Sequence, residues 1–311
     1  MIIDAHAHIF SQIHGMTGTG PTRDLGYGRV AQGSEKIQLL PQFFEKTIFT
    51  PEALIANMDW AGVDKAILLQ GPFYGECNTY VLEALNHYPD RFVGAAFCDP
   101  WALNGQRDLL EVLDSGKFKA VKMECSEAAG LCGLHPEADI ISPEISWMWK
   151  ELLKRDLVVV FDLGAVGSRS YQTSSVAALA KMVPDLKIVI AHLAQLRPQV
   201  ESNPEQMKLW TAQIDLGHLP NVWFDSAALP AYLPQEDFPF PTAERYLHMA
   251  VDRIGPSKIL WGTDVPGLLT SASYLQLAKM AKLHVGFLSP DEQAMILWKN
   301  ASLLFDIPSK M

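Results

Sequence analysis

The apolar residues of this chain fall into short, nearly uninterrupted runs separated by segments of mixed polarity. Runs such as VDKAILLQ at 63–70 and LVVVF at 157–161 are typical of strands that are buried on both faces. The pattern predicts strands at residues 1–3, 63–70, 92–97, 118–123, 157–161, 186–191, 221–224 and 258–261. Strands of this kind belong in a parallel sheet that is covered by helices.

The segments between these runs predict helices, and several of them begin with a recognisable start signal. Thr50-Pro51-Glu52 and Ser142-Pro143-Glu144 each place a hydroxyl cap before a proline in the first turn. Ser289 and Glu292 have the spacing of a capping box. We expect helices at 50–60, 78–87, 103–113, 142–154, 176–182, 205–214, 243–254 and 274–282, and an extra C-terminal helix from residue 289.

Eight strand–helix units in succession favour an α/β fold, the closed (β/α)8 or TIM barrel, with residues 1–311 forming one domain. The alternative is an open doubly wound sheet, but no GxGxxG follows the first strand and no Walker motif occurs. The glycine-rich segment from Ser11 to Thr50 matches no unit of this repeat. We expect it to be a long irregular loop after strand 1, acting as a lid or binding loop or remaining disordered.

Composition excludes several classes of function. The chain has 311 residues, a net charge of −10 and scattered basic residues, which argues against nucleic acid and anionic membrane surfaces as partners. The four cysteines form no CxxC pair, and the N-terminal stretch lacks the features of a signal peptide. We therefore expect a cytoplasmic enzyme for a small-molecule substrate. The Trp and Met residues of its helices are compatible with a homodimer.

Polar side chains follow nearly every predicted strand, at the end where a (β/α)8 barrel carries its chemistry. Burying so many ionisable groups costs stability unless they are paired, hydrogen-bonded or bound to a metal. The pattern therefore indicates an enzyme. In strand order, these residues are His6 and His8, Gln70, Asp99, Glu124, Asp162, His192, Asp225 and Asp264.

His6 and His8 form the most informative pair, because residues two apart on a strand point to the same face. Two neutral imidazoles on one face can bind one metal ion, and Asp264 offers a carboxylate at the end of the last strand. The alternative is two surface histidines that follow Asp4 in a turn. The carboxylate of Asp264 favours the metal site.

Several motifs along the chain resemble those of the amidohydrolase-related family. They are Asp4-Ala5-His6-Ala7-His8, Val121-Lys122-Met123, Ile190-Ala191-His192-Leu193, Trp261-Gly262-Thr263-Asp264-Val265-Pro266 and Lys299-Asn300-Ala301. The resemblance is to the branch that includes aminocarboxymuconate-semialdehyde decarboxylase and the resorcylate-type decarboxylases. It implies one divalent metal ion, zinc first and manganese second, held by His6, His8, a residue of the fifth strand and Asp264. It also implies that His192 lies beside the metal as a catalytic or substrate-binding residue.

One position departs from the family pattern, which has a histidine at the end of the fifth strand where this chain has Asp162. Asp162 could itself be the ligand, or it could orient a histidine that is one. A third reading is that the site has lost its metal. Glu124 at the end of strand 4 could also fill the gap, or it could form a buried ion pair with Lys122 or Arg169.

The residues fit a metal-dependent hydrolase that attacks an amide or lactone bond of a small cyclic or carboxylated substrate through a metal-activated water. Asp264 would then move the proton as general base and acid, and His192 would stabilise the oxyanion. The alternatives are a decarboxylase of a small aromatic or unsaturated acid, a hydratase or isomerase, a metal-free lactonase, and an inactive binding barrel. Candidate substrate contacts are Glu124, Arg169, Arg23, His135 in a loop over the barrel mouth, and Tyr74 with Phe73 as an apolar wall.

Overall fold

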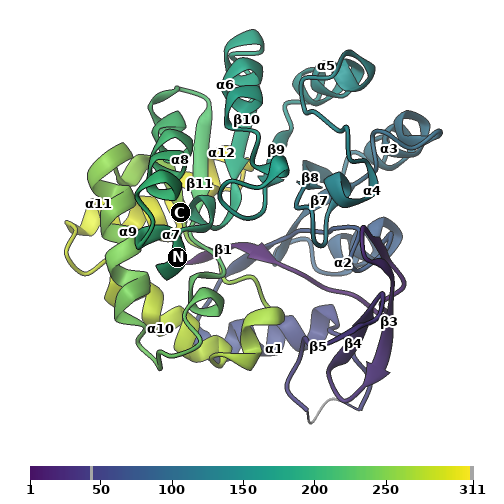
Figure 1. Cartoon of the computed structure of the whole chain (residues 1–311). Helices are drawn as coiled ribbons and strands as arrows, with labels where there is room; N and C mark the ends of the chain where they lie inside the picture. Colours follow the sequence, from purple (N-terminus) through teal and green to yellow (C-terminus); the bar gives the residue numbers. More distant parts are fainter. Residues whose placement is uncertain (43–44, 309–311) are drawn as a thin grey trace.

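The computed structural model describes residues 1–42 and 45–308 (Figure 1). Within these residues, eight parallel strands lie in the order in which they occur along the chain. They are β1 (Ile3–Ala7), β6 (Lys65–Leu68), β7 (Phe92–Phe97), β8 (Phe118–Glu124), β9 (Val158–Asp162), β10 (Lys187–Ile190), β11 (Val222–Asp225) and β12 (Ile259–Leu260).

Backbone hydrogen bonds join the first strand to the chain around the last one. The amide of Ala5 donates to the carbonyl of Trp261 at 2.9 Å, and that of His8 donates to the carbonyl of Val265 at 2.8 Å. In the opposite direction, the Asp264 amide donates to the carbonyl of His6 at 2.7 Å. The sheet therefore closes on itself, and the expected α/β fold of the (β/α)8 type is confirmed.

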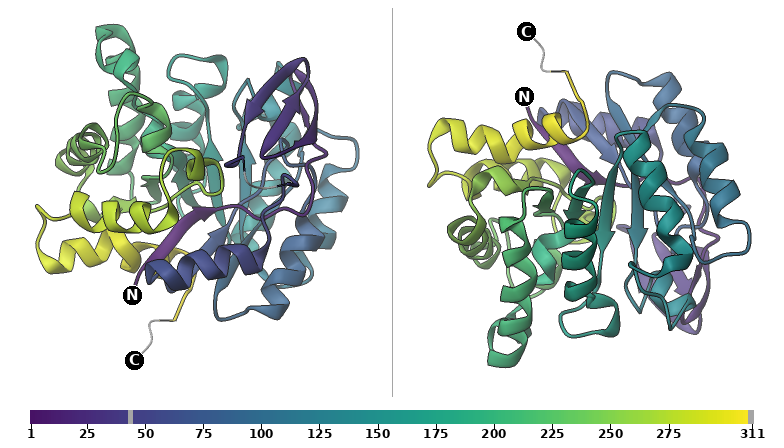
Figure 2. Two further views of the ribbon diagram at one scale, coloured as in Figure 1. Left: turned by 90° about the horizontal axis from the view of Figure 1, so that it is seen from below. Right: turned by 90° about the horizontal axis from the view of Figure 1, so that it is seen from above.

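Helices surround the sheet (Figure 2). The longer ones are α1 (Pro51–Ala61), α2 (Asn78–His87), α3 (Gly105–Leu113), α5 (Ser146–Lys154), α6 (Thr173–Met182), α8 (Pro204–Ile214), α9 (Pro241–Ile254) and α10 (Tyr274–His284). Short ones are α4 (Leu131–Leu134), α7 (Pro198–Glu201), α11 (Pro290–Ala294) and α12 (Asn300–Leu304), the last two joined by the π-helical turn η8 (Met295–Lys299). Among the described residues, no helix combines the length and apolarity needed to cross a membrane.

Short 3₁₀ turns connect many of these elements. They are η1 (Pro143–Ile145), η2 (Arg169–Tyr171), η3 (Ala191–Gln195), η4 (Asp215–His218), η5 (Leu229–Tyr232), η6 (Pro256–Lys258) and η7 (Gly267–Thr270). The expected cap of α1 is present, since the Thr50 hydroxyl accepts a hydrogen bond from the Ala53 amide at 3.2 Å. The capping box of Ser289 and Glu292 is also present. Ser142, in contrast, makes no side-chain cap, and η1 follows it, so that α5 begins only at Ser146.

The segment after β1 differs from the irregular loop that we expected. Residues 16–38 form a four-stranded antiparallel sheet of β2 (Met16–Thr17), β3 (Gly20–Gly26), β4 (Arg29–Gln32) and β5 (Glu35–Gln38). Tyr27 and Gly28 have φ angles of 54° and 73° and make the tight two-residue turn between β3 and β4. Glycines that look like loop composition thus supply the turns of a small sheet, which we call the cap sheet.

Apolar side chains fill the interior of the barrel and determine where the polar ones point. The buried interior residues include Ile3, Ala5, Ile67, Leu69, Ala95, Ala120, Val158, Val160, Val189 and Leu260. Because side chains alternate along a strand, Lys122 and Glu124 share the interior side with Ala120, and Asp162 shares it with Val160. The barrel thus directs these polar groups into its C-terminal mouth.

Candidate active site

A cavity of about 290 Å³ opens at the C-terminal ends of the strands. Its wall combines polar residues of the strand ends with apolar residues and with a contribution from the cap sheet. The lining residues are His6, His8, Gln32, Ile37, Leu39, Gln70, Gly71, Phe73, Tyr74, Lys122, Glu124, Ser126, Ala129, Asp162, His192 and Asp264. The segment that we expected to be a lid or binding loop therefore contributes to the site as a folded sheet.

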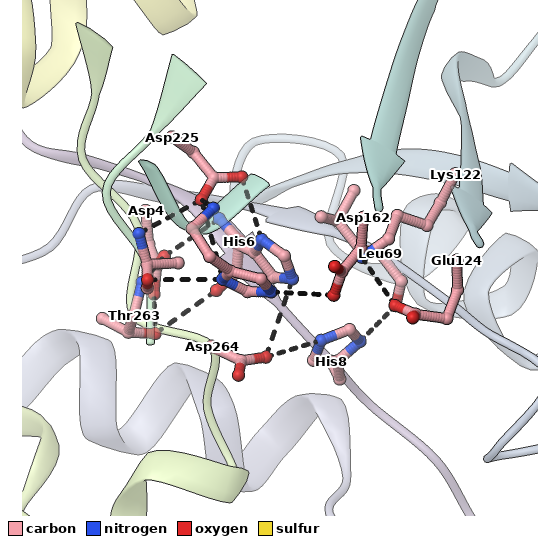
Figure 3. Close-up of polar contacts among 12 residues, drawn as sticks. Asp4, His6, His8, Leu69, Lys122, Glu124, Asp162, Asp225, Thr263 and Asp264 are labelled. Atoms are coloured by element: carbon pink, nitrogen blue, oxygen red, sulfur yellow. Dashed lines mark hydrogen bonds and ion pairs between the residues drawn. The ribbon is translucent and has the colours of Figure 1, made fainter. Parts of the chain in front are cut away.

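His6 in β1 and His8 directly after it reach this cavity because the strand is irregular. The pairing of β1 with β6 shifts register between Asp4 and Ala7, and such irregularities re-aim side chains beside active sites. Figure 3 shows His6 and His8 directed toward Asp264. The spacing of the two histidines alone predicted a shared face, which the bend of the strand turns toward the mouth of the barrel.

Hydrogen bonds at the Nδ1 atoms determine which nitrogen of each histidine is free. His6 Nδ1 lies 3.0 Å from Oδ2 of Asp225, and His8 Nδ1 lies 2.9 Å from the carbonyl oxygen of Leu69. Both partners are acceptors, so each Nδ1 carries the proton and each Nε2 presents a lone pair. Burial and the charge of Lys122 lower the pKa of His6 to about 4, so its ring is neutral.

The free Nε2 atoms converge on one carboxylate oxygen. Asp264 Oδ1 lies 3.0 Å from Nε2 of His8 and 3.6 Å from Nε2 of His6. Within the described chain, His6 Nε2 is buried and has no hydrogen-bond partner. These separations suit three ligands of one ion at about 2.0–2.2 Å each. The residues present therefore fit a divalent metal, with two imidazoles and one carboxylate as candidate ligands.

Asp225 lies behind this cluster and is almost completely buried. His6, His192 and Asp225 also lie close enough to one another to share a metal ion, with their ligand atoms within 4.8 Å. However, both oxygens of Asp225 already accept hydrogen bonds, from the His6 ring at one oxygen and from the His192 amide at 2.9 Å at the other. Asp225 therefore orients His6, as carboxylates commonly do behind metal-binding histidines.

Asp162 contacts His192 at the end of the neighbouring strand. Its Oδ2 lies 3.1 Å from His192 Nε2, and its Oδ1 accepts hydrogen bonds from Gln195 at 2.9 Å and from the Gly164 amide at 3.0 Å. Burial raises the pKa of Asp162, but the charge and hydrogen bond of His192 and the charge of Lys122 hold it well below its usual range. Asp162 is therefore an ionised partner of His192.

His192 is correspondingly cationic. Burial lowers its pKa, but the charge of Asp162, their hydrogen bond, and the charges of Asp264 and Asp225 raise it to about 9. For Asp264, burial acts to raise the pKa, whereas the imidazoles of His8, His6 and His192 beside it lower it to about 2. At neutral pH the cavity thus holds an imidazolium beside an ionised carboxylate.

Lys122 and Glu124 occupy the opposite side of the cavity. Burial and the charge of Asp162 raise the pKa of Glu124 to about 8, against the opposing charge of Lys122. The Lys122 ammonium lies 3.7 Å from Oε2 of Glu124, and its pKa is raised because four nearby carboxyl groups outweigh burial. The predicted ion pair of Glu124 with Lys122 is thus present, whereas Arg169 pairs with Glu127 at 3.2 Å.

The backbone around two of these residues is left-handed. Asp264 has a φ of 65°, and four consecutive residues from His192 to Gln195 have φ between 45° and 61°. Non-glycine residues pay roughly 1–2 kcal/mol each for this conformation. Hydrogen bonds of the His192 amide to Asp225 and of the Asp264 amide to His6 hold it in place. Such strain is common where side chains are aimed for function.

The first and last motifs of the sequence are joined directly. The buried carboxylate of Asp4 accepts hydrogen bonds from the amide and hydroxyl of Thr263, at 2.9 Å and 2.6 Å, and from the Tyr274 hydroxyl at 2.9 Å. Burial raises the pKa of Asp4 to about 6 despite these bonds. Asp4 thus fastens the strand of His6 and His8 to the segment of Asp264.

Only part of the expected substrate-contact set lies at this cavity. Tyr74 and Glu124 line it, and the ring of Tyr74 lies 5.0 Å from that of His8. Arg23, Arg169 and His135, all within the described residues, are not among the lining residues. Arg169 donates to the Cys132 carbonyl, and His135 pairs with Asp99 at 2.7 Å. Arg169 and His135 are therefore engaged outside the cavity.

Three residues at the site were not singled out by sequence reasoning for any chemistry. Asp225 and Gln70 appear only as strand ends, and Lys122 appears only as an ion-pair partner. The signal for Lys122 was a charged residue inside the apolar run FKAVKM, at the same face as Ala120. For Asp225 the signal was its position directly after a buried strand.

The chain is similar to known proteins both in sequence and in fold. A sequence profile described as amidohydrolase matches residues 3–307. A search of curated proteins found no match. Similar solved structures include a zinc-bound amidohydrolase from Burkholderia multivorans, at 18% identity and a TM-score of 0.72, covering 99% of this chain and 100% of that one.

Two further structures illustrate the range of chemistry on this fold. One is described as a probable 2-pyrone-4,6-dicarboxylic acid hydrolase from Acinetobacter baumannii with bound citric acid, at 18% identity, a TM-score of 0.68, and 98% and 99% coverage. The other is 5-carboxyvanillate decarboxylase from Sphingomonas paucimobilis, at 14% identity, a TM-score of 0.55, and 82% coverage of both chains. At these identities the likeness concerns the fold, whereas the profile spans nearly the whole sequence. The chain belongs to the amidohydrolase family.

Proposed function

We propose that this protein is a metal-dependent hydrolase that opens a lactone or cyclic amide bond of a small substrate. The observation that carries the proposal is the convergence of His6 Nε2, His8 Nε2 and Asp264 Oδ1, three acceptors with no proton donor between them. Three acceptors at such distances repel one another unless a cation lies between them. We assign these residues as the metal ligands, with zinc first and manganese second.

A divalent ion in this position supplies a Lewis acid and lowers the pKa of a coordinated water. Among the three ligands, Asp264 has the most accessible side chain, 26% exposed against 1% for His6 and 7% for His8. Because Asp264 is ionised, its Oδ2 can accept the proton of the attacking water and pass it to the leaving group. Asp264 therefore binds the metal ion through Oδ1 and transfers the proton through Oδ2.

His192 provides positive charge where negative charge develops. Its ring centroid lies 4.7 Å from that of His6, and its two nitrogens face the acceptors Asp162 and the Ala227 carbonyl. A fixed imidazolium stabilises an oxyanion electrostatically without reorganising during the reaction. Asp162 keeps His192 protonated, so we assign Asp162 as a positioning residue in place of the missing strand-5 histidine, not as a ligand.

The shape of the cavity favours a small cyclic substrate. Its volume of about 290 Å³ is at the low end for small-molecule sites. Phe73 and Tyr74 lie edge to face, and Ile37 of the cap sheet and Leu39 directly after it complete an apolar wall. The hydrolase described for the Acinetobacter baumannii structure, whose name refers to a cyclic ester, supports the same class of bond.

The test is hydrolysis measured by proton release, with a panel of five- and six-membered lactones and cyclic amides. Protein stripped with a chelator is compared with protein reconstituted with zinc or manganese. We expect turnover only in the reconstituted protein, and its loss in His8→Gln and Asp264→Asn. Equal turnover in stripped protein would establish the metal-free lactonase instead. Release of CO₂ from a carboxylated ring would establish the decarboxylase.

A further inference from the structure

Gln70 is a buried amide on the wall of the catalytic cavity. It follows β6 directly and is 2% exposed. Its Nε2 donates to the carbonyl of Ala95 at 2.8 Å and to Oδ1 of Asn78 at 3.0 Å. These bonds attach the amide to β7 on one side and to the start of α2 on the other.

The orientation of this amide is determined by its neighbours. The backbone of Phe97 both donates to Asn78 Oδ1 at 2.9 Å and accepts from Asn78 Nδ2 at 2.8 Å. Asn78 must therefore present its oxygen to Gln70, which can answer only with its NH₂ group. The carbonyl oxygen of Ala95 is also an acceptor, so it too requires the NH₂ group of Gln70. If the amide of Gln70 were flipped, its oxygen would face two other acceptors, the carbonyl oxygen of Ala95 and Oδ1 of Asn78.

The remaining atom of the amide, Gln70 Oε1, has no hydrogen-bond partner among the residues that the structure describes, although it is buried. A buried acceptor without a donor is costly, and such groups in native proteins call for a specific explanation. With Nε2 held by Ala95 and Asn78, the opposite edge of the amide is the one left for the cavity. A bound molecule that donates a proton to Oε1 would remove the cost.

Lys122 lines the same cavity and is a donor, whereas Gln70 Oε1 is an acceptor. Its side chain is 1% exposed, and its closest carboxylate contact is the 3.7 Å distance to Glu124, longer than a hydrogen bond. Figure 3 shows its side chain reaching toward Asp162 and Glu124 at the edge of the candidate metal site. Counting the described residues alone, the cavity thus has an acceptor that lacks a donor and an ammonium that lacks a close acceptor.

We infer that Gln70 and Lys122 recognise the substrate, and that the substrate is a ring bearing a hydroxyl or N–H group beside an acceptor oxygen. The hydroxyl or N–H donates to Gln70 Oε1, and Lys122 donates to the acceptor oxygen. This inference rests on the proposed function and names the substrate class of that site. A ring substituted only with carboxylates would place an acceptor against Oε1.

The charges on the wall point the same way. Of the described residues that line the cavity, none is an arginine, and Lys122 is the lysine among them. The metal ion is needed at the bond that reacts, and His192 is already paired with Asp162, so Lys122 is the basic side chain of this wall left for a substrate carboxylate. The substrate class is therefore a hydroxylated or amide ring with at most one carboxylate.

Binding of rings that cannot be hydrolysed tests this inference separately from catalysis. The probes are cyclopentanone, 2- and 3-hydroxycyclopentanone and 3-oxocyclopentane-1-carboxylate, titrated calorimetrically into the zinc-reconstituted protein. We expect one hydroxylated ring to bind about 10- to 100-fold more tightly than cyclopentanone, the gain from satisfying one buried acceptor. The carboxylated ring, which can pair with Lys122 but offers no donor to Gln70 Oε1, should bind less tightly than the best hydroxylated ring.

Two variants locate the preference. Gln70→Met keeps the length of the side chain but removes Oε1, so the hydroxyl preference should fall to about threefold or less. Phe73→Leu alters the apolar wall of the same cavity and should weaken all probes while retaining the preference. If Gln70→Met does not fold, the wild-type series decides alone.

Ring binding, the contribution of Gln70 and lactone hydrolysis are measured independently of one another. Wild-type affinities for hydroxylated and plain rings within about threefold of each other, or tighter binding of the carboxylated ring than of every hydroxylated ring, would overturn the inference. A preference that survives in Gln70→Met would overturn the assignment to Gln70. Absence of lactone hydrolysis with the preference intact would contradict the proposed function alone.

Discussion

Replacing Asp225 by asparagine should switch the tautomer of His6 while leaving the shape of the site almost unchanged. Asp225 Oδ1 accepts from the amides of His192 and Ala227, at 2.9 Å and 3.1 Å, and the asparagine oxygen can keep both bonds. Its Nδ2 would then lie where Oδ2 stands, 3.0 Å from His6 Nδ1. A donor at that position requires a lone pair on Nδ1, and moves the proton of His6 to Nε2.

The expected effect is on metal affinity, because a protonated Nε2 cannot be a ligand. Partners that orient a metal-binding histidine contribute about 10- to 100-fold in affinity, or about 1.4–2.7 kcal/mol. The variant also removes a negative charge close to the ion. Burial raises the pKa of Asp225, but His6 and His192 hold it below its usual value, so the lost group is a carboxylate. We therefore expect the upper part of that range.

The zinc dissociation constant is measured by competition with a chromophoric chelator, with circular dichroism as the check on folding. The matched control is Asp99→Asn, which makes the same chemical change beside another histidine, His135, outside the cavity. A zinc affinity of Asp225→Asn within about threefold of wild type would refute the tautomer argument. So would an equal loss in Asp99→Asn.

Three further outcomes follow from the site. Asp162→Ala should retain about one metal per chain by elemental analysis, while the pKa of His192 falls from about 9 toward its ordinary value of 6.5 by NMR; loss of the metal would make Asp162 a ligand. Gly262→Ala should lower both metal content and melting temperature, since a Cβ there would lie 2.8 Å from Cβ of His6; unchanged values would contradict the packing argument. Because the folded-state pKa of His192 is raised, the stability gained from its pairing with Asp162 is complete below pH 6.5 and is lost as the pH rises through about 9. The melting-temperature difference between wild type and His192→Gln should therefore shrink over that interval, and a constant difference would argue against the ion pair.

The elements of the barrel were predictable because each depends on local sequence. Helix α2 and strand β7 have the bounds expected from the pattern, at 78–87 and 92–97. A strand buried on both faces must be apolar throughout, and a helix start must satisfy its free amides, so both leave a local signature. The cap sheet lacked such a signature, because its short strands are partly exposed and its turns are rich in glycine.

The candidate ligands His6, His8 and Asp264 were also predictable, from polar residues directly after buried strands. The sequence likewise placed His192, Asp162 and Glu124 at the same end of the barrel. A strand exit determines which residue reaches the mouth, since the backbone between neighbours is fixed by the sheet. It does not determine which group that residue meets there.

Those pairings were decided by the tertiary structure alone. His6 and its orienting partner Asp225 are 219 residues apart, and Asp162 pairs with His192 across neighbouring strands. Because the fixed amide of Asn78 holds the NH₂ group of Gln70, Gln70 Oε1 points elsewhere and has no donor among the described residues. Arg23 and Arg169, which seemed suited to a substrate, do not line the cavity, although Gln32 and Ile37 of the cap sheet do. The sequence determined the barrel and which residues reach its mouth, while closure of the barrel determined which lone pairs, protons and charges face one another.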